Sequence, residues 1–191
     1  AAATTIAAIA VIAGRRTPSH TRRVGRSSVA NAPSPAGGSR MTAIRINRAP
    51  VLTLWAAVVA ERLGSPWETA LTVGQAVAGM TAHAKGVRLG IYAQPEERPH
   101  EPMSSKPEGA TGAIHFRPLL GRNVPVVPTK DGLRAVSKGE IAKPESVARY
   151  LASKFGDELE PARAAMMRLA ASLPADELAE QAFRLYERFR P

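Results

Sequence analysis

The stretch "APVLTLWAAVVAERLGSPWETALTVGQAVAGMTAHAKG", residues 49–86, contains two helix patterns joined by a turn at Gly64. Residues 49–60 are almost entirely apolar, which is typical of a helix buried on all sides. We expect this helix over residues 50–63, with Pro50 in its first turn and Gly64 at its end. The nearly apolar run has only twelve residues and would span about 18 Å, too little for a hydrocarbon core of ~30 Å, so we expect no membrane partner.

The second helix has a start signal in its first four residues. Ser65 and Glu68 are spaced as a capping box, in which each side chain accepts from the other residue's amide, and Pro66 fills the first helical position. Gly86 is the expected stop. The sequence therefore predicts a tight helix pair over residues 50–86.

Two interpretations of the helix pair stay open: a DNA-reading helix-turn-helix unit, or an αα-hairpin buried in the core. The spacing of small and apolar residues around Gly64 fits the first, but Trp67 is bulky for a surface that approaches DNA. In the first interpretation, polar side chains of the second helix contact base edges and cations elsewhere contact phosphates. The candidates for base edges are Thr69, Thr72 and Gln75, and those for phosphates are Arg45, Arg48, Lys85, Arg88, Arg122, Lys130, Arg134 and Lys138.

The spacing of apolar residues is no longer helical after the helix pair. Residues 93–112 contain many prolines and glutamates, and we expect a mobile loop there. The segments "AIHFRPL", "VPVVP" and "LRAVS" that follow are short and rich in β-forming residues, and Asp131-Gly132 is a tight-turn signal. These features predict a small antiparallel β element.

Three further helices are expected over the last 48 residues, 144–191. Apolar residues recur there at three- and four-residue spacing, and Gly156 and Pro174 separate the repeats. The fold class is therefore α+β and mostly helical, as a single domain over residues 43–191. The apolar row of the second of these helices predicts that Leu169 is buried.

Residues 1–42 differ in composition from the rest of the chain. Residues 1–40 carry six arginines and no acid, whereas the whole chain has a net charge of +10. We expect a basic flexible extension outside the fold. It is interpreted as an upstream extension ahead of a natural start at Met41, as a basic arm, or as a targeting segment rich in arginine and serine.

The chain resembles a family of uncharacterised bacterial proteins. The similarity runs from "AIRINRAPVLTLWAAVVAERLG" through "ALTVGQAVAG" and "AKGVRLGIY" to "VARYLASKFG" and "AFRLYERFRP", and covers most of residues 43–191. No activity is established for that family, so the resemblance implies no site residues. It supports Met41 as the natural start, and members continue beyond the final "RFRP".

Catalytic and metal-binding signatures are weak. The chain has no cysteine, and its four histidines are scattered. His83 is better explained as a residue near the C-terminal end of a helix, where the helix dipole favours it, than as a metal ligand. We therefore expect no metal, no cofactor and, more weakly, no enzymatic activity in a cytoplasmic protein. Two functions remain: a DNA-binding, regulatory protein, or a protein-interaction module or homodimer that uses the C-terminal amphipathic helices.

Overall fold

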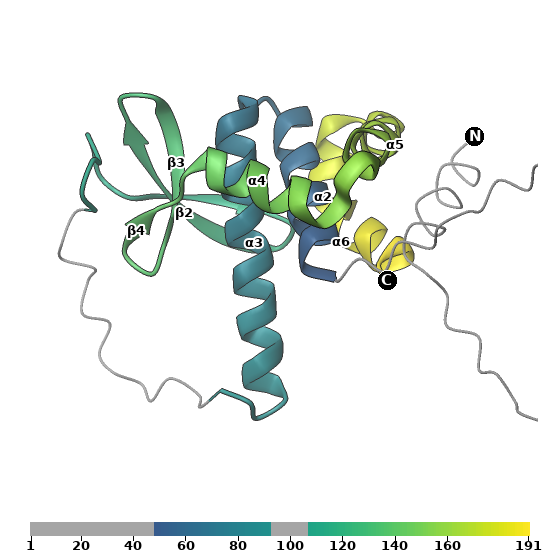
Figure 1. The fold of residues 1–191 in the computed structure, drawn as a ribbon, viewed down its shortest axis with the longest axis horizontal. Helices are drawn as coiled ribbons and strands as arrows, with labels where there is room; N and C mark the ends of the chain where they lie inside the picture. Colours follow the sequence, from purple (N-terminus) through teal and green to yellow (C-terminus); the bar gives the residue numbers. More distant parts are fainter. Residues whose placement is uncertain (1–47, 93–106) are drawn as a thin grey trace, which may run out of the picture.

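The computed structural model describes residues 48–92 and 107–191. It shows an α+β fold that is mostly helical, with a helix pair, a four-stranded antiparallel sheet and a C-terminal helical segment (Figure 1). The extension over residues 1–42 and most of the loop expected over residues 93–112 lie outside the described residues. The elements are α2 (Arg48–Arg62), α3 (Trp67–Arg88), β1 (His115–Leu119), β2 (Arg122–Thr129), β3 (Gly132–Ser137), β4 (Glu140–Ile141), α4 (Pro144–Phe155), a 3-10 turn (Gly156–Glu158), α5 (Leu159–Ala171) and α6 (Ala175–Phe189).

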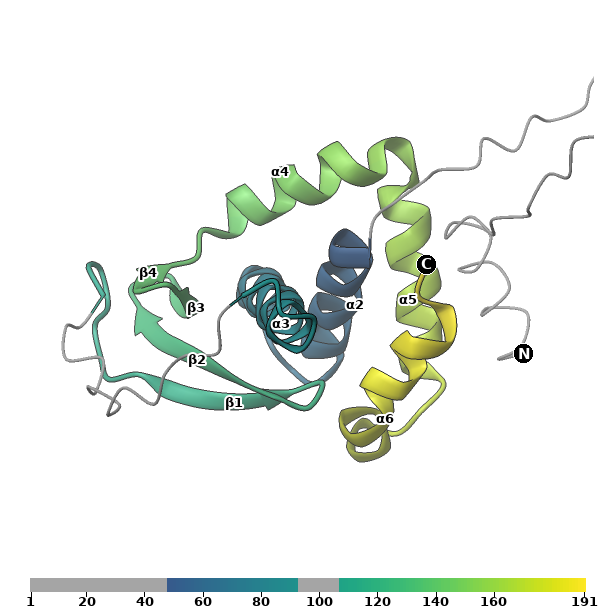
Figure 2. The ribbon, with the colours of Figure 1, turned by 90° about the horizontal axis from the view of Figure 1, so that it is seen from below.

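Helices α2 and α3 form an antiparallel hairpin whose members lie side by side (Figures 1 and 2). Gly64, with φ +90°, makes the turn that the sequence predicts. The helices approach most closely at Gly74, where a Cβ atom would lie 2.5 Å from the carbonyl oxygen of Thr53 and 2.9 Å from the amide nitrogen of Ala57. Only glycine lets the two backbones pack this closely, so this residue sets the spacing of the hairpin.

Helix α2 is the centre of the fold. Every residue from Pro50 to Ala60 is buried, and the helix contacts α3, α4, α5 and α6. Trp55 is fully buried, donates from Nε1 to the carbonyl oxygen of Ala182 at 2.8 Å, and meets the ring of Phe189 edge-on at 5.3 Å between centroids. The prediction that Leu169 is buried is confirmed, since only 3% of it is exposed.

An ion pair and a cation–π contact, both made by one arginine, hold α5 against the helix pair. Arg163 of α5 donates from Nη2 to both carboxylate oxygens of Glu61, at 3.0 and 3.2 Å. Its guanidinium group lies 3.9 Å from the ring centroid of Trp67. A single arginine thus connects α5 to the end of α2 and the start of α3.

The sheet has the order β1-β2-β3-β4 and curves around α3, with α4 crossing on another side (Figure 2). Val124 and Val126 of β2 and Ala135 of β3 belong to the same core as the helices. Gly132, with φ +104°, completes the expected turn between β2 and β3. The end of β3 pairs with β4, and the part before it meets α3. There, Thr69 Oγ1 donates to the Leu133 carbonyl at 2.8 Å, and the Ala135 amide donates to Thr72 Oγ1 at 3.2 Å.

Two expectations about the ends of α3 are wrong. Ser65 does not cap the helix: α3 begins at Trp67 with no side-chain cap, and Ser65 Oγ instead accepts from Arg117 of β1 at 3.1 Å. Gly86 does not end it either, because the helix continues to Arg88 and the left-handed residue is Gly90, with φ +68°. At Gly86 the ring of Tyr92 folds back onto the space that a side chain would occupy.

The second half of α3 leaves the body of the molecule (Figure 1). From Gly79 onwards most side chains are exposed, in contrast with the buried first half. We call residues 79–92 the arm. Its tip is closed by backbone hydrogen bonds from Leu89 to Lys85 and from Ile91 to Gly86, and by stacking of His83 on Tyr92 at 5.5 Å between ring centroids.

Candidate functional site

The threonines that we expected to face DNA are buried. Thr69 is 2% exposed and Thr72 is fully buried, because both hydroxyls hydrogen-bond with the part of the β3 edge that β4 leaves unpaired. The first half of α3 therefore stabilises a strand edge and is closed to base pairs. This part of the helix pair matches the αα-hairpin interpretation. Gln75 is the one base-edge candidate that stays exposed.

The cations chosen from the sequence do not form one patch. Arg134 is a wrong candidate for contact with a DNA backbone, because only 8% of it is exposed and it donates from Nη1 to the Leu133 carbonyl at 2.9 Å. Lys130 and Lys138 lie in the turns at opposite ends of β3. The others are also scattered: Arg45 lies outside the described residues, Arg48 begins α2, Arg122 begins β2 and is half-buried, and Lys85 and Arg88 lie on the arm.

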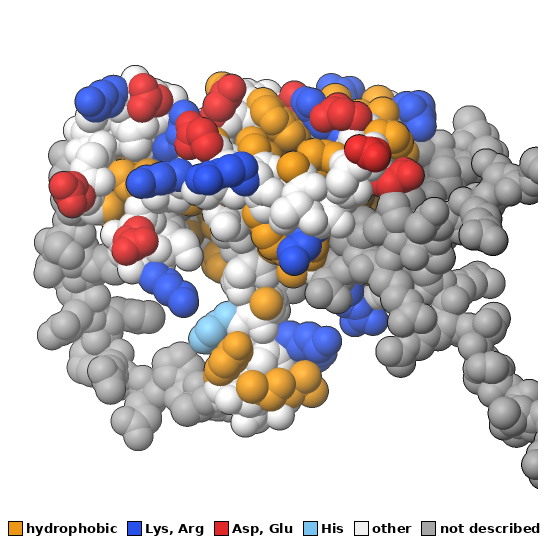
Figure 3. Space-filling view, in the orientation of Figure 1, with side chains coloured by type: hydrophobic (Ala, Val, Ile, Leu, Met, Phe, Trp, Pro, Cys, Tyr) orange, Lys and Arg blue, Asp and Glu red, His pale blue; other side chains and the backbone are white. Residues whose placement is uncertain are grey.

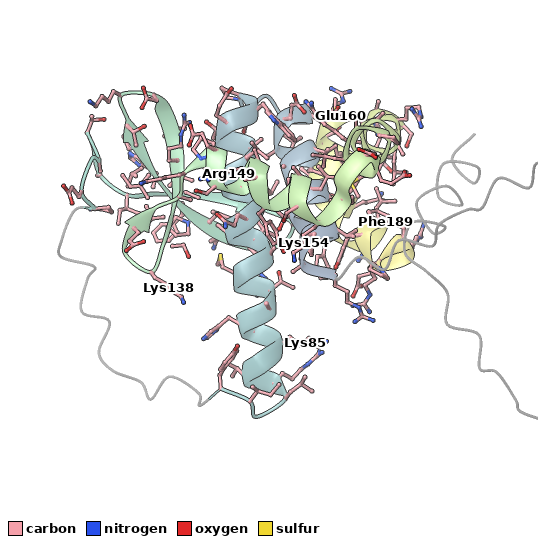
Figure 4. The ribbon with its side chains drawn as sticks, in the orientation of Figure 1. Lys85, Lys138, Arg149, Lys154, Glu160 and Phe189 are labelled. Atoms are coloured by element: carbon pink, nitrogen blue, oxygen red, sulfur yellow. The ribbon has the colours of Figure 1, made fainter. Side chains whose placement is uncertain are left out.

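A different set of cations gathers on one side of the molecule. Lys138, Arg149 and Lys154 lie on the side where α4 crosses α3, and Lys85 of the arm lies below them (Figure 4). All four are exposed, as is Lys143 at the start of α4. We call these five residues the basic face; the same view in Figure 3 shows lysine and arginine side chains across this region.

The basic face borders, through Lys138 and Lys143, a cleft between α3, the β3–β4 turn and the start of α4. The cleft has a volume of about 650 Å³, and Gln75, Lys138, Lys143 and Ser146 are among its lining residues. Glu140 is the acid that lines it. Small residues, Ala76 and Gly79, form the α3 side. The cleft therefore combines cations with neutral hydrogen-bonding groups.

Sequence reasoning missed Lys143, Arg149 and Lys154. The apolar spacing of Val147, Leu151 and Phe155 could have shown that the other side chains of α4 point away from the core. No local signal, however, shows that α4 crosses beside α3. Only the packed structure places Lys143 with Lys138 at one cleft, and Arg149 and Lys154 on the same side of the molecule.

A second cleft lies on the other side of the β4–α4 connection. Its volume is about 870 Å³, and Arg134 lines it together with Thr129, Lys130 and Lys143. Four acids, Glu108, Asp131, Glu140 and Glu145, also line it, so its charge is mixed. We call it the Arg134 cleft.

The C-terminal helices do not offer the apolar docking surface that the interaction hypothesis requires. The stripes of α5 and α6 are used in the core: Met166, Leu178 and Phe189 are each at most 2% exposed. Among the residues that the structure describes, the exposed large apolar side chains are Leu89, Ile91 and Tyr92 at the tip of the arm, and Phe116 on β1.

Within residues 48–92 and 107–191, no group of three or more histidine, aspartate or glutamate side chains is arranged to hold a metal ion. His83 stacks on Tyr92. Burial raises the pKa of the Tyr186 hydroxyl above its ordinary value, although Arg190 and Arg48 act in the opposite direction. That hydroxyl donates to the Arg48 carbonyl at 3.3 Å, so its environment is explained by packing against α2.

Comparisons of the chain with family models, with curated proteins and with solved structures give no match. No helix in the described part of the chain is both long enough and apolar enough to cross a membrane.

Proposed function

We propose that the protein binds nucleic acid, with DNA as the expected form, through the basic face and without catalysis. The observation that carries the proposal is a set of five exposed cations on one side of the molecule. Two of them, Lys138 and Lys143, line a cleft in which Glu140 is the one lining acid. Lysine and arginine side chains on one face are suited to a phosphate backbone, because each contact releases condensed counterions.

This mode of binding differs from a helix-turn-helix unit. The start of α3 lies under the sheet, so the backbone contacts come from α4 and the β3–β4 turn, and Lys85 extends them along the arm. Gln75 and Ser146 supply hydrogen-bonding groups inside the cleft. Contacts of this kind position a nucleic acid but carry little sequence information, so we expect weak sequence preference.

The salt dependence of binding tests this proposal. We expect duplex DNA to bind with an affinity that falls steeply with salt, and the double variant Lys138→Ala, Arg149→Ala to lower the slope of log K against log salt by about one unit per lost phosphate contact. Fluorescence anisotropy at several salt concentrations measures both quantities.

A matched control removes two exposed cations elsewhere, Lys130 at the opposite end of β3 and Arg184 on α6. This variant has the same net charge, so it should keep the wild-type slope if the basic face is the contact surface. Equal slopes for the two double variants would contradict the proposal. Binding that disappears when the chain starts at Met41 would assign it to the basic extension instead.

A second candidate function is self-association through the arm. The tip carries Leu89, Ile91 and Tyr92, which are 58%, 67% and 51% exposed, beside Lys85 and Arg88. The opposite charge is present on the same chain, where Asp157 and Glu160 are exposed at the start of α5. A second copy therefore offers an acidic surface to a basic and apolar arm.

Sedimentation velocity at increasing protein concentration tests this candidate. We expect the wild-type chain to form a larger species as concentration rises, and Leu89→Glu with Ile91→Glu to remain a monomer. The unfolding midpoint of the variant should stay close to wild type, because both side chains are exposed. Phe116→Glu, at an exposed site away from the arm, is the control; self-association unchanged by the arm variant would exclude the arm as the contact.

A further inference from the structure

The Arg134 cleft contains a buried cation without a carboxylate partner. Arg134 is 8% exposed, and no aspartate or glutamate among the described residues lies within ion-pair distance of it. Its hydrogen bonds are from Nη1, to the Leu133 carbonyl at 2.9 Å and to Thr69 Oγ1 at 3.4 Å. Arginine keeps its charge in proteins, and a buried charge is normally paired.

These two hydrogen bonds do not explain why an arginine is buried at this position. The Leu133 carbonyl already accepts from Thr69 Oγ1 at 2.8 Å, so the edge of β3 has a partner without it. No bond from Nη2 or Nε to a described residue accompanies them. The remaining donors of the guanidinium group therefore stay available to a ligand in the cleft that Arg134 lines.

The other lining groups indicate what the ligand carries. Lys130, Lys143 and the N-terminus of α4, which has no side-chain cap, favour an anionic group near Arg134. The four acids, Glu108, Asp131, Glu140 and Glu145, disfavour a polyanion and favour a cationic group. A volume of about 870 Å³ accommodates a small molecule.

We propose that the Arg134 cleft binds a small zwitterion, with its anionic group on the guanidinium group of Arg134 and its ammonium group towards the acids of the cleft. This site is separate from the basic face, although Lys143 borders both clefts. The anionic group is a carboxylate or a phosphate, since a guanidinium group pairs with either through two parallel hydrogen bonds.

The shift of the thermal unfolding midpoint tests the site, with 4-aminobutyrate and phosphoethanolamine as carboxylate and phosphate probes. Acetate and ethylammonium, at the same ionic strength, carry one charge each. We expect a saturable rise in the midpoint with at least one zwitterion and a smaller rise with acetate or ethylammonium, because a ligand that binds only the folded state stabilises it. The stronger zwitterion identifies the anionic group.

Arg134→Gln should weaken binding of the better probe about tenfold or more, because it removes the charged donor. Lys130→Gln, at an exposed turn, should weaken binding by a smaller factor without affecting the fold, and decides the question if Arg134→Gln does not fold. Arg122→Gln is the control, since it removes a half-buried arginine of β2 outside the cleft. No midpoint shift with either zwitterion, or equal shifts in wild type, Arg134→Gln and Lys130→Gln, would overturn the proposal.

Discussion

Replacing Gly74 with alanine is expected to lower the free energy of unfolding by about 3 kcal/mol, because it forces the helices of the central hairpin apart. The added Cβ would lie 2.5 Å from the Thr53 carbonyl oxygen and 2.9 Å from the Ala57 amide nitrogen. Both are backbone atoms of α2, so no side-chain rotation can relieve the clash. A typical domain has only about 5–15 kcal/mol of stability in total, and the loss should be plain in the urea midpoint.

Gly79→Ala is the matched control for this prediction. Gly79 lies on the same helix, five residues further on, and a Cβ there would meet nothing within 4 Å. Alanine is a better helix former than glycine by about 1 kcal/mol, so this variant should be as stable as wild type or more stable. Equal destabilisation by both changes would show that glycine flexibility, and not close packing, is what the hairpin needs.

The second large effect is expected at Trp55. Trp55→Ala should lower the free energy of unfolding by about 3–5 kcal/mol, through lost transfer energy and a cavity in the centre of the fold. The indole is fully buried between α2 and α6 and packs edge-on against Phe189. Equilibrium unfolding followed by circular dichroism measures the loss.

Trp55→Phe separates packing from hydrogen bonding. Phenylalanine keeps much of the apolar contact but removes the Nε1 donor, so the Ala182 carbonyl loses its 2.8 Å bond to the indole and keeps its place in the hydrogen-bond pattern of α6. We expect a smaller loss than in Trp55→Ala, of about 1 kcal/mol for the lost hydrogen bond together with reduced packing. Phe116→Ala, at a site that is 68% exposed, should change the stability by less than about 0.5 kcal/mol. A comparable loss at Phe116 would mean that the central position of Trp55 does not account for its effect.

The position of α3 links the stability of the protein with its proposed function. Its first half is held by α2 through Gly74 and by β3 through Thr69 and Thr72. Its second half continues into solvent as the arm and carries Lys85, the member of the basic face that lies away from the body of the molecule. Damage to the hairpin should therefore weaken nucleic-acid binding indirectly, and variants of exposed cations are the cleaner test of contact.

Local patterns predicted most of the secondary structure. The apolar run before Gly64, the glycine itself and Gly156, with φ +55°, mark helix bounds because burial on all sides and a left-handed residue each leave a signal in a few adjacent positions. The turn at Asp131-Gly132 and the mostly helical α+β class were predictable for the same reason. The short strand β4 was missed, since two residues give too little pattern.

The sequence by itself determined that α2 is the buried centre of the protein, because eleven consecutive residues, from Pro50 to Ala60, leave it no face for water. Only the tertiary structure decided which polar face of α3 is buried and which is exposed to solvent. The groups that bury Thr69 and Thr72 belong to β3, 64 and 63 residues further along the chain, and polar side chains beside an unpaired strand edge look the same in sequence as side chains in solvent. The same long-range packing buried Arg134 and placed the cations of α4 on the same side of the molecule as Lys138, because a charge pattern shows which residues are polar but not which surface they share.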